Sequence, residues 1–408
     1  MIGRRQLPVA SRVAPGAIGR AVLAALSPDS ELQGSVVRVL RSMYGARRIA
    51  LTDSGTSALV AALRLTVGEG GSVAFPGYAC VDLAAAARFA GVKVRLYDID
   101  PHTLSPDLDS LAAAMHRGVG AVVIAHLYGF PADVRAASEL AAAAGIPIIE
   151  DAAQGAGGTM DGRLLGSFGA LSILSFGRGK GTTGGSGGAL LCHDAAFGDA
   201  VSEARRALGS PLRGWRDLFR ASAQWLLGRP ALYGLPSSIP ALRLGEMVYH
   251  PAHEPRSLST AAAALVREAL DAAPHDVALR RHNAAALDMA AAEGADINSI
   301  ASLPGAESGY LRFPVLDRGS RVEQPGLGIL RGYPLTLHEQ AELRPCLVPG
   351  EPSTPGASEL ARTLFTLPTH YMVRPSDIKV MMEWLRVPTH LFLPAPAPAH
   401  QPRAARSH

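Results

Sequence analysis

The sequence predicts an α/β protein whose larger part contains a mostly parallel β-sheet flanked by helices. Short apolar runs alternate with helical stretches from about residue 48 to residue 192. This alternation is typical of right-handed βαβ crossovers, which build parallel sheets buried on both faces. The pattern is mixed after residue 251, which predicts a smaller α+β domain.

Each predicted strand is a short apolar run bounded by Gly, Pro or Asp, and each predicted helix is a longer alanine-rich or leucine-rich stretch. The strands are predicted at 47–55, 72–77, 92–100, 121–129, 146–154, 171–177 and 188–194. The helices between them are predicted at 56–66, 81–91, 107–118 and 132–145.

We predict a large domain over residues 1–250, with a helical, arginine-rich insert at about 196–250. A small C-terminal domain is predicted over 251–390. The tail at 391–408 has no apolar period and is rich in Pro and Ala, which predicts disorder.

Composition excludes several classes of protein. The net charge is only +4 and no block of five like charges occurs, so no nucleic-acid stripe is indicated. The three cysteines form no CxxC pair, which argues against both a disulfide framework and a zinc site. The N-terminal apolar run is interrupted by Pro15 and Arg20, so we expect a cytoplasmic protein without a signal peptide or membrane span.

Lys180 lies in "SFGRGKGTTGGSGG", a stretch that is half glycine. Only three of the 39 basic residues are lysines, and the other 36 are arginines. A lysine in such a chain can do what arginine cannot, because its amine loses a proton and acts as a nucleophile. A solvated loop residue is the plainer alternative, so the neighbouring residues must decide.

Polar residues follow several predicted strands, where parallel α/β sheets bind ligands. Gly55 and Thr56 stand between a strand and a helix, where free N–H groups can hold a phosphate. Asp151 and Gln154 end another strand, and Ser175 ends a third. Walker A and Rossmann patterns both fail around Lys180, because the required spacing and the following helix are missing.

These residues fit a pyridoxal 5'-phosphate (PLP) site. PLP needs a lysine amine for a Schiff base, an acid against its pyridine nitrogen, phosphate donors and a partner for its ring hydroxyl. Each residue alone has a simpler explanation: Asp151 as a helix N-cap, and Thr56 and Ser175 as turn residues. Their coincidence at strand ends favours the PLP site.

The motifs "LTDSGTSALVAAL", "VRLYDIDPHTLSPD", "HLYGFPADV", "IIEDAAQGAGG", "GRLLGSFG" and "SFGRGKGTTGGSGG" occur in this order. They resemble the DegT/DnrJ/EryC1/StrS family of sugar aminotransferases, which have PLP fold type I. The likeness is strong from about 50 to 192 and looser in "GYPLTLHEQ" and "ASELARTLFTLPTH".

The resemblance implies a role for individual residues. Lys180 would be the Schiff-base lysine, Asp151 the partner of the pyridine nitrogen and Gln154 a neighbour of the ring hydroxyl. The phosphate would be held by three residues, namely Gly55, Thr56 and Ser175. His338 matches a small-domain histidine near the substrate.

The chain departs from the family pattern at four places. Ser186 stands where the family usually has Glu, and Gly177 where it often has His. Cys80 takes the place of an aromatic residue on the ring face, and the insert at 196–250 is longer than in the simplest members. These departures affect substrate and reaction type more than cofactor binding.

The resemblance therefore implies a PLP-dependent aminotransferase that acts as a homodimer. Glutamate is the expected amino donor, and a nucleotide-linked keto-sugar the expected acceptor, for an amino sugar in a polysaccharide or glycosylated metabolite. Lys180 would move a proton between the donor's Cα and the cofactor's C4′. Two alternatives stay open: another PLP reaction on the same fold, and a non-catalytic sensor of PLP or a nucleotide sugar.

Two further interpretations concern single segments. The stretch "RGWRDLFRASAQWLLGRP" can be a basic helix on a membrane, but general helix behaviour favours packing of Trp215, Phe219 and Trp225 into the protein or a dimer by roughly three to one. Cys80 is expected to place its sulfur at the ring face, with Tyr78 pointing elsewhere and able to reach the substrate. Strand alternation would put both residues on the same side.

Overall fold

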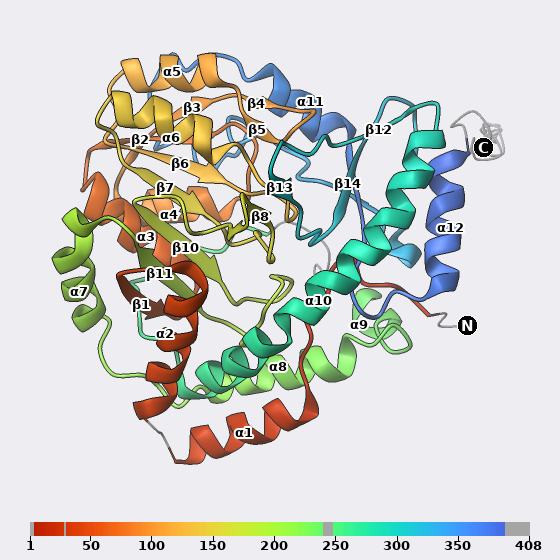
Figure 1. Ribbon diagram of the computed structural model, residues 1–408, viewed down its shortest axis with the longest axis horizontal. Helices are drawn as coiled ribbons and strands as arrows, with labels where there is room; N and C mark the ends of the chain where they lie inside the picture. The colour runs from red at the N-terminus through yellow and green to blue at the C-terminus, as the bar shows by residue number, and fades with distance from the viewer. Residues whose placement is uncertain (1–3, 28–29, 240–247, 388–408) are drawn as a thin grey trace, which may run out of the picture.

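The computed structural model describes residues 4–27, 30–239 and 248–387 (Figure 1). The predicted disordered tail at 391–408 lies outside the described residues. None of the helices in the described part of the chain has the length and hydropathy that a membrane crossing requires.

A seven-stranded sheet forms the centre of the larger part, in the order β1-β11-β10-β7-β6-β2-β3. Only β11 runs against its neighbours, because it pairs antiparallel with β1 and β10 while every other pair is parallel. The predicted mostly parallel sheet is confirmed. Its strands are β1 (Arg48–Thr52), β2 (Ser72–Pro76), β3 (Lys93–Tyr97), β6 (Ala121–Ala125), β7 (Ile148–Asp151), β10 (Leu171–Ser175) and β11 (Gly188–Cys192).

Helices cover both faces of this sheet, so its strands are buried on both sides as their continuous apolar runs require. One face packs against α2, α5, α6 and the first half of α10, and the other against α3, α4 and α7. These helices are α2 (Ser30–Tyr44), α3 (Gly55–Thr66), α4 (Asp82–Ala90), α5 (Leu108–His116), α6 (Val134–Ala143), α7 (Gly198–Ala207) and α10 (Thr260–Glu293).

A second, antiparallel sheet in the order β12-β14-β16-β15 forms the smaller part. It packs against α12 and the second half of α10, so α10 joins both hydrophobic cores (Figure 1). The domain boundary at 250/251 stays a prediction. The elements are β12 (Ile297–Ser299), β14 (Phe313–Asp317), β15 (Leu330–Arg331), β16 (Leu364–Leu367), α11 (Pro355–Thr363) and α12 (Pro375–Arg386).

The described part of the predicted insert contains three α-helices, α7, α8 and α9, and α8 lies beside α1 along the lower edge in Figure 1. The inner face of α8 packs against the protein through Leu218 and Ala221. Its outer face exposes Trp215 and Phe219, whose surfaces are 47% and 74% accessible. Packing within the chain therefore holds for Trp225, which is half-buried, but not for the other two aromatic residues, whose packing in a dimer stays a prediction. These helices are α1 (Pro15–Leu26), α8 (Trp215–Leu227) and α9 (Gly234–Ser237).

The remaining short elements lie mostly in the connections around the two sheets. They are β4 (Ile99–Asp100), β5 (Ser105–Pro106), β8 (Thr159–Met160), β9 (Arg163–Leu164), β13 (Ala306–Glu307), η1 (Ala195–Phe197) and η3 (Pro325–Leu327).

A buried arginine ties the small sheet to the C-terminal end of α12. Arg321 is 2% exposed and donates to Asp317 Oδ1 at 2.8 Å. It also donates to three backbone carbonyls, those of Trp384, Leu385 and Val387. The guanidinium thus satisfies carbonyl groups that the helix end leaves without partners.

Replacing Arg321 with Met should lower the free energy of unfolding by about 3 kcal/mol, because it leaves the Asp317 carboxylate buried without its partner. Chemical denaturation measures this change. The matched control is Arg386→Met, which breaks the exposed pair with Glu293 and should cost less than about 1 kcal/mol. Equal losses in the two variants would contradict the assigned role of Arg321.

Candidate active site

A cavity opens at the carboxyl ends of the parallel strands. This is where open α/β sheets bind ligands. Seven of the nine predicted site residues line it: Gly55, Thr56, Cys80, Asp151, Gln154, Ser175 and Lys180. Tyr78 and His338 do not belong to the lining, while Asp82 and His126 do.

One end of the cavity is suited to an anion. Gly55 and Thr56 form the first turn of α3, whose N–H groups carry the positive end of the helix dipole. Ser54 caps the helix by accepting a hydrogen bond from Ser57 N at 3.0 Å. A Cβ atom at position 55 would lie 2.8 Å from Ser175 Cβ, so glycine is required where α3 meets the end of β10.

Asp151 ends β7 and is 8% exposed. Burial raises the pKa of this carboxyl above its ordinary value, although the Ala153 amide and Lys180 act in the opposite direction. Ala153 N donates to Oδ1 at 3.0 Å. A buried carboxylate facing a cavity is stabilised by a cation placed there, and a protonated ring nitrogen is such a cation.

Lys180 lies in the loop 176–187 between β10 and β11. The loop is closed by a hydrogen bond from Phe176 N to Gly187 O at 2.8 Å and by one from Gly184 N to Phe176 O at 2.9 Å. Gly187 has a φ of +116°, which residues other than glycine rarely adopt. The glycine content therefore follows from the shape of the loop that brings Lys180 to the cavity.

Gln154 connects the cavity to the small sheet. Its Oε1 accepts from Tyr128 N at 3.1 Å, and its Nε2 donates to Tyr333 OH. Nε2 carries a second hydrogen, which is available to a group in the cavity.

The structure separates Tyr78 from Cys80. β2 ends at Pro76, so the alternation assumed for positions 78 and 80 does not extend to them, and that assumption is wrong. Tyr78 is fully buried, and its hydroxyl accepts from Tyr333 N at 2.6 Å. A substrate contact by Tyr78 stays a prediction, as does one by His338, which is exposed away from the lining residues.

Cys80 does face the cavity, and its Sγ donates to Asp82 Oδ2 at 3.3 Å. Burial, reinforced by Asp82, raises the pKa of this thiol to about 12, so the sulfur is protonated at neutral pH. Asp82 was not predicted as a site residue. The signal that could have found it is an acidic residue in the first turn of a helix that follows a strand end.

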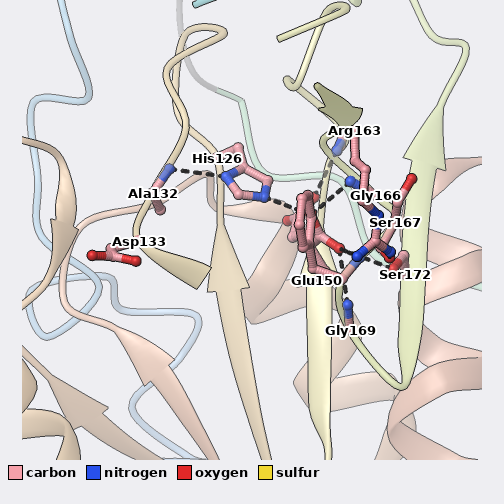
Figure 2. A network of polar contacts seen from close by, with 12 residues as sticks. His126, Ala132, Asp133, Glu150, Arg163, Gly166, Ser167, Gly169 and Ser172 are labelled. Atoms are coloured by element: carbon pink, nitrogen blue, oxygen red, sulfur yellow. Dashed lines mark hydrogen bonds and ion pairs between the residues drawn. The ribbon is translucent and has the colours of Figure 1, made fainter. Parts of the chain in front are cut away.

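Figure 2 shows a second network behind the cavity, which sequence reasoning also missed. Glu150 is fully buried and accepts from His126 Nε2 at 2.8 Å. His126 Nδ1 accepts from Ala132 N at 3.0 Å, so the ring is neutral with its proton on Nε2. Glu150 also accepts from a backbone turn and a serine, namely Gly166 N, Phe168 N, Gly169 N and Ser172 Oγ.

Among the residues described, no group of three or more His, Cys, Asp or Glu side chains could hold a metal ion. The fold and the cavity together define an α/β protein in which a lysine amine and a buried carboxylate line one cavity at the strand ends.

The sequence profile of the DegT/DnrJ/EryC1/StrS aminotransferase family matches residues 35–386. The chain belongs to this family, whose members depend on PLP.

Individual relatives cover less of the chain. It is 35% identical to L-glutamine:2-deoxy-scyllo-inosose aminotransferase from Streptomyces kanamyceticus. This match extends over 239 residues, which are 58% of this chain and 50% of that protein. It is 35% identical over 144 residues to UDP-N-acetyl-3-dehydro-alpha-D-glucosamine 3-aminotransferase from Acidithiobacillus ferrooxidans, 35% and 39% of the two chains. The matches thus span half or less of these relatives. DesV from S. venezuelae shares the fold, with a TM-score of 0.71 and 24% identity over 91% of this chain and 92% of that one.

The residues present fit PLP. The closely approached Gly55 and the first turn of α3 can take its phosphate, and the buried Asp151 can take its ring nitrogen.

Replacing Glu150 with Gln should lower the free energy of unfolding at pH 7 by about 3 kcal/mol, because a buried carboxylate with five donors loses its charge. Burial alone would raise the pKa of Glu150, but hydrogen bonds from His126 and the backbone hold it below its ordinary value. Its stabilisation is therefore present above about pH 4.5 and is lost as the pH falls through the folded-state pKa.

Thermal denaturation between pH 3 and pH 7 measures this dependence. The Gln variant should lose less stability on acidification than the unchanged protein. Glu139→Gln, at an exposed position, is the control and should follow the unchanged protein. An acid limb in Glu150→Gln as steep as in the control would contradict the interpretation.

Asp151→Asn should separate stability from cofactor binding. Burial raises the folded-state pKa of Asp151. Ionised Asp151 therefore lowers the free energy of unfolding at pH values above that pKa. This loss of stability is absent below the pKa of Asp151 in the unfolded chain. The cofactor-free Asn variant should therefore be at least as stable at pH 7 as the unchanged protein. Its Kd for PLP should rise about 30-fold, or ~2 kcal/mol. Unchanged PLP affinity would make Asp151 a structural cap.

Proposed function

We propose that the protein is a PLP-dependent aminotransferase that moves an amino group onto a keto-sugar or keto-cyclitol. The observation that carries this proposal is the placement of the Lys180 amine and the Asp151 carboxylate on one cavity at the strand ends. Bound PLP would supply a carbonyl carbon that accepts an amino group from one substrate and passes it to another, and a ring that serves as the electron sink.

The residues of the chain would divide the work in three ways. Gly55, Thr56 and Ser175 would anchor the phosphate, and Asp151 would keep the ring nitrogen protonated through its charge. Lys180 Nζ would bind the cofactor covalently. Once displaced by a substrate amine, it would take the proton from the donor's Cα and deliver it to C4′ of the cofactor.

Gln154 would orient the cofactor ring by donating to the ring hydroxyl, because the second Nε2 hydrogen of Gln154 is available at the cavity. Cys80 would lie over the ring face as a neutral thiol, where it offers less stacking area than an aromatic ring. Both assignments rest on the lining of the cavity.

The relatives support two acceptor classes. The names of the two relatives specify a cyclitol ketone and a UDP-linked keto-sugar, so we propose a cyclic polyhydroxylated ketone as the acceptor. The first name also specifies glutamine as donor, so glutamine stands beside glutamate as a candidate donor. A homodimer is part of this proposal, and equilibrium sedimentation measures it.

Purified protein loaded with PLP should show a visible absorbance band that glutamate or glutamine bleaches within one turnover. A keto-sugar or keto-cyclitol acceptor should then restore it. A band that persists with both donors would favour a sensor over an aminotransferase. Lys180→Arg is the matched control: guanidinium stays protonated and forms no imine, so this variant should fold but show no such band and no turnover. An Arg variant with the full band would overturn the site.

A further inference from the structure

The insert helix α8 reaches the loop that carries Lys180 through one carboxylate. Asp217 lies in the first turn of α8, and its side chain is only 15% exposed. Its Oδ1 accepts from Ser186 Oγ at 2.8 Å. Ser186 belongs to the same loop as Lys180, so the contact joins α8 directly to that loop.

The other oxygen of Asp217 binds the start of the long helix. Oδ2 accepts from Ser259 Oγ at 2.7 Å, and Ser259 Oγ in turn accepts from Ala262 N at 3.2 Å as the N-cap of α10. Asp217 is therefore bound to the N-terminus of α10 through Ser259, whose own position is fixed because it caps that helix. Among the described residues, the cation paired with Asp217 is Arg220, whose Nη1 lies 3.8 Å from the carboxylate and which is half-exposed, so the two hydroxyls are closer partners of the carboxylate.

The backbones of the loop and α8 also fit closely at this point. A Cβ atom at Gly185 would lie 2.5 Å from the carbonyl oxygen of Asp217, so no larger residue could hold the loop in this place. Elsewhere in the loop, Thr183 and Gly184 bind back to Phe176, and Gly184 also approaches Val266 of α10. Position 186, where the chain departs from the family pattern, is held from outside the loop by a side-chain hydrogen bond.

We propose that Asp217 is a positioning residue: through Ser186 it fixes the loop 176–187 in the conformation that presents Lys180 to the cavity. This inference rests on the proposed function, because Lys180 matters only if it binds the cofactor. A glycine-rich loop samples many conformations when it is free. The apparent affinity for PLP falls when fewer molecules adopt the binding-competent conformation of the loop. The contact from α8 therefore raises cofactor affinity without touching the cofactor.

Two variants test the contact between Ser186 and Asp217, one on each side. Ser186→Ala removes the hydroxyl on the loop, and Asp217→Ala removes the carboxylate. Both should speed backbone hydrogen exchange of residues 176–187 in the cofactor-free protein and raise the Kd for PLP, followed by absorbance, about tenfold. Because the two residues act through one contact, the double variant should resemble the more affected single variant rather than show the product of both effects.

Ser259→Ala is the matched control, because it removes the other hydrogen bond to Asp217 and leaves Ser186 in place. It should lower the melting temperature through the lost helix cap, yet leave loop exchange and the Kd for PLP unchanged. Wild-type exchange in Ser186→Ala would overturn the inference, and so would faster exchange with an unchanged Kd. Failure of the unchanged protein to bind PLP would instead overturn the proposed function, and loop exchange would still report on the contact.

Discussion

Two neighbouring carboxylates at the end of β7 set the constraint around which the site is built. Glu150 and Asp151 are both buried, and burying a carboxylate is costly unless hydrogen bonds or a cation compensate it. The protein satisfies Glu150 completely, with five donors from His126, a backbone turn and a serine. Among the described residues, Asp151 has a single hydrogen-bond donor, the backbone N–H of Ala153, and it lines the cavity. One carboxylate stabilises the scaffold, and its neighbour is the one that we propose for cofactor binding.

The loop at 176–187 faces a different constraint, because it must be both glycine-rich and well placed. Glycine gives the backbone the conformations that bring Lys180 over the strand ends. The same residues have the largest conformational entropy to lose. Contacts from outside the loop are the physical remedy, and the hydrogen bond from Ser186 to Asp217 is one such contact. The insert that interrupts the sequence pattern thus lies against the site.

Sequence reasoning found the residues that local rules can reach. Asp151 and Ser175 each end an apolar strand, and Gly55 begins the helix that follows one, so the rule for parallel sheets brings them together. The strand alternation assumed for Tyr78 and Cys80 is wrong, because β2 ends at Pro76. Glu150 escaped notice because a charged residue inside a buried strand has meaning only once its partners are known. Ser186 and Asp217 are far apart in the chain, and no local pattern relates them.

The long helix α10 also has a mechanical consequence. Its first half belongs to the core of the large sheet and its second half to the core of the small one, so no flexible linker joins the two at this point. A rotation of the small sheet that opens or narrows the cavity must therefore bend α10. Pro274 lies near the middle of the helix, where its missing N–H removes one hydrogen bond of the helix. The axis of such a rotation is expected to pass through this turn. The two sheets would then move relative to each other by elastic bending of α10 and not by rotation about a flexible loop.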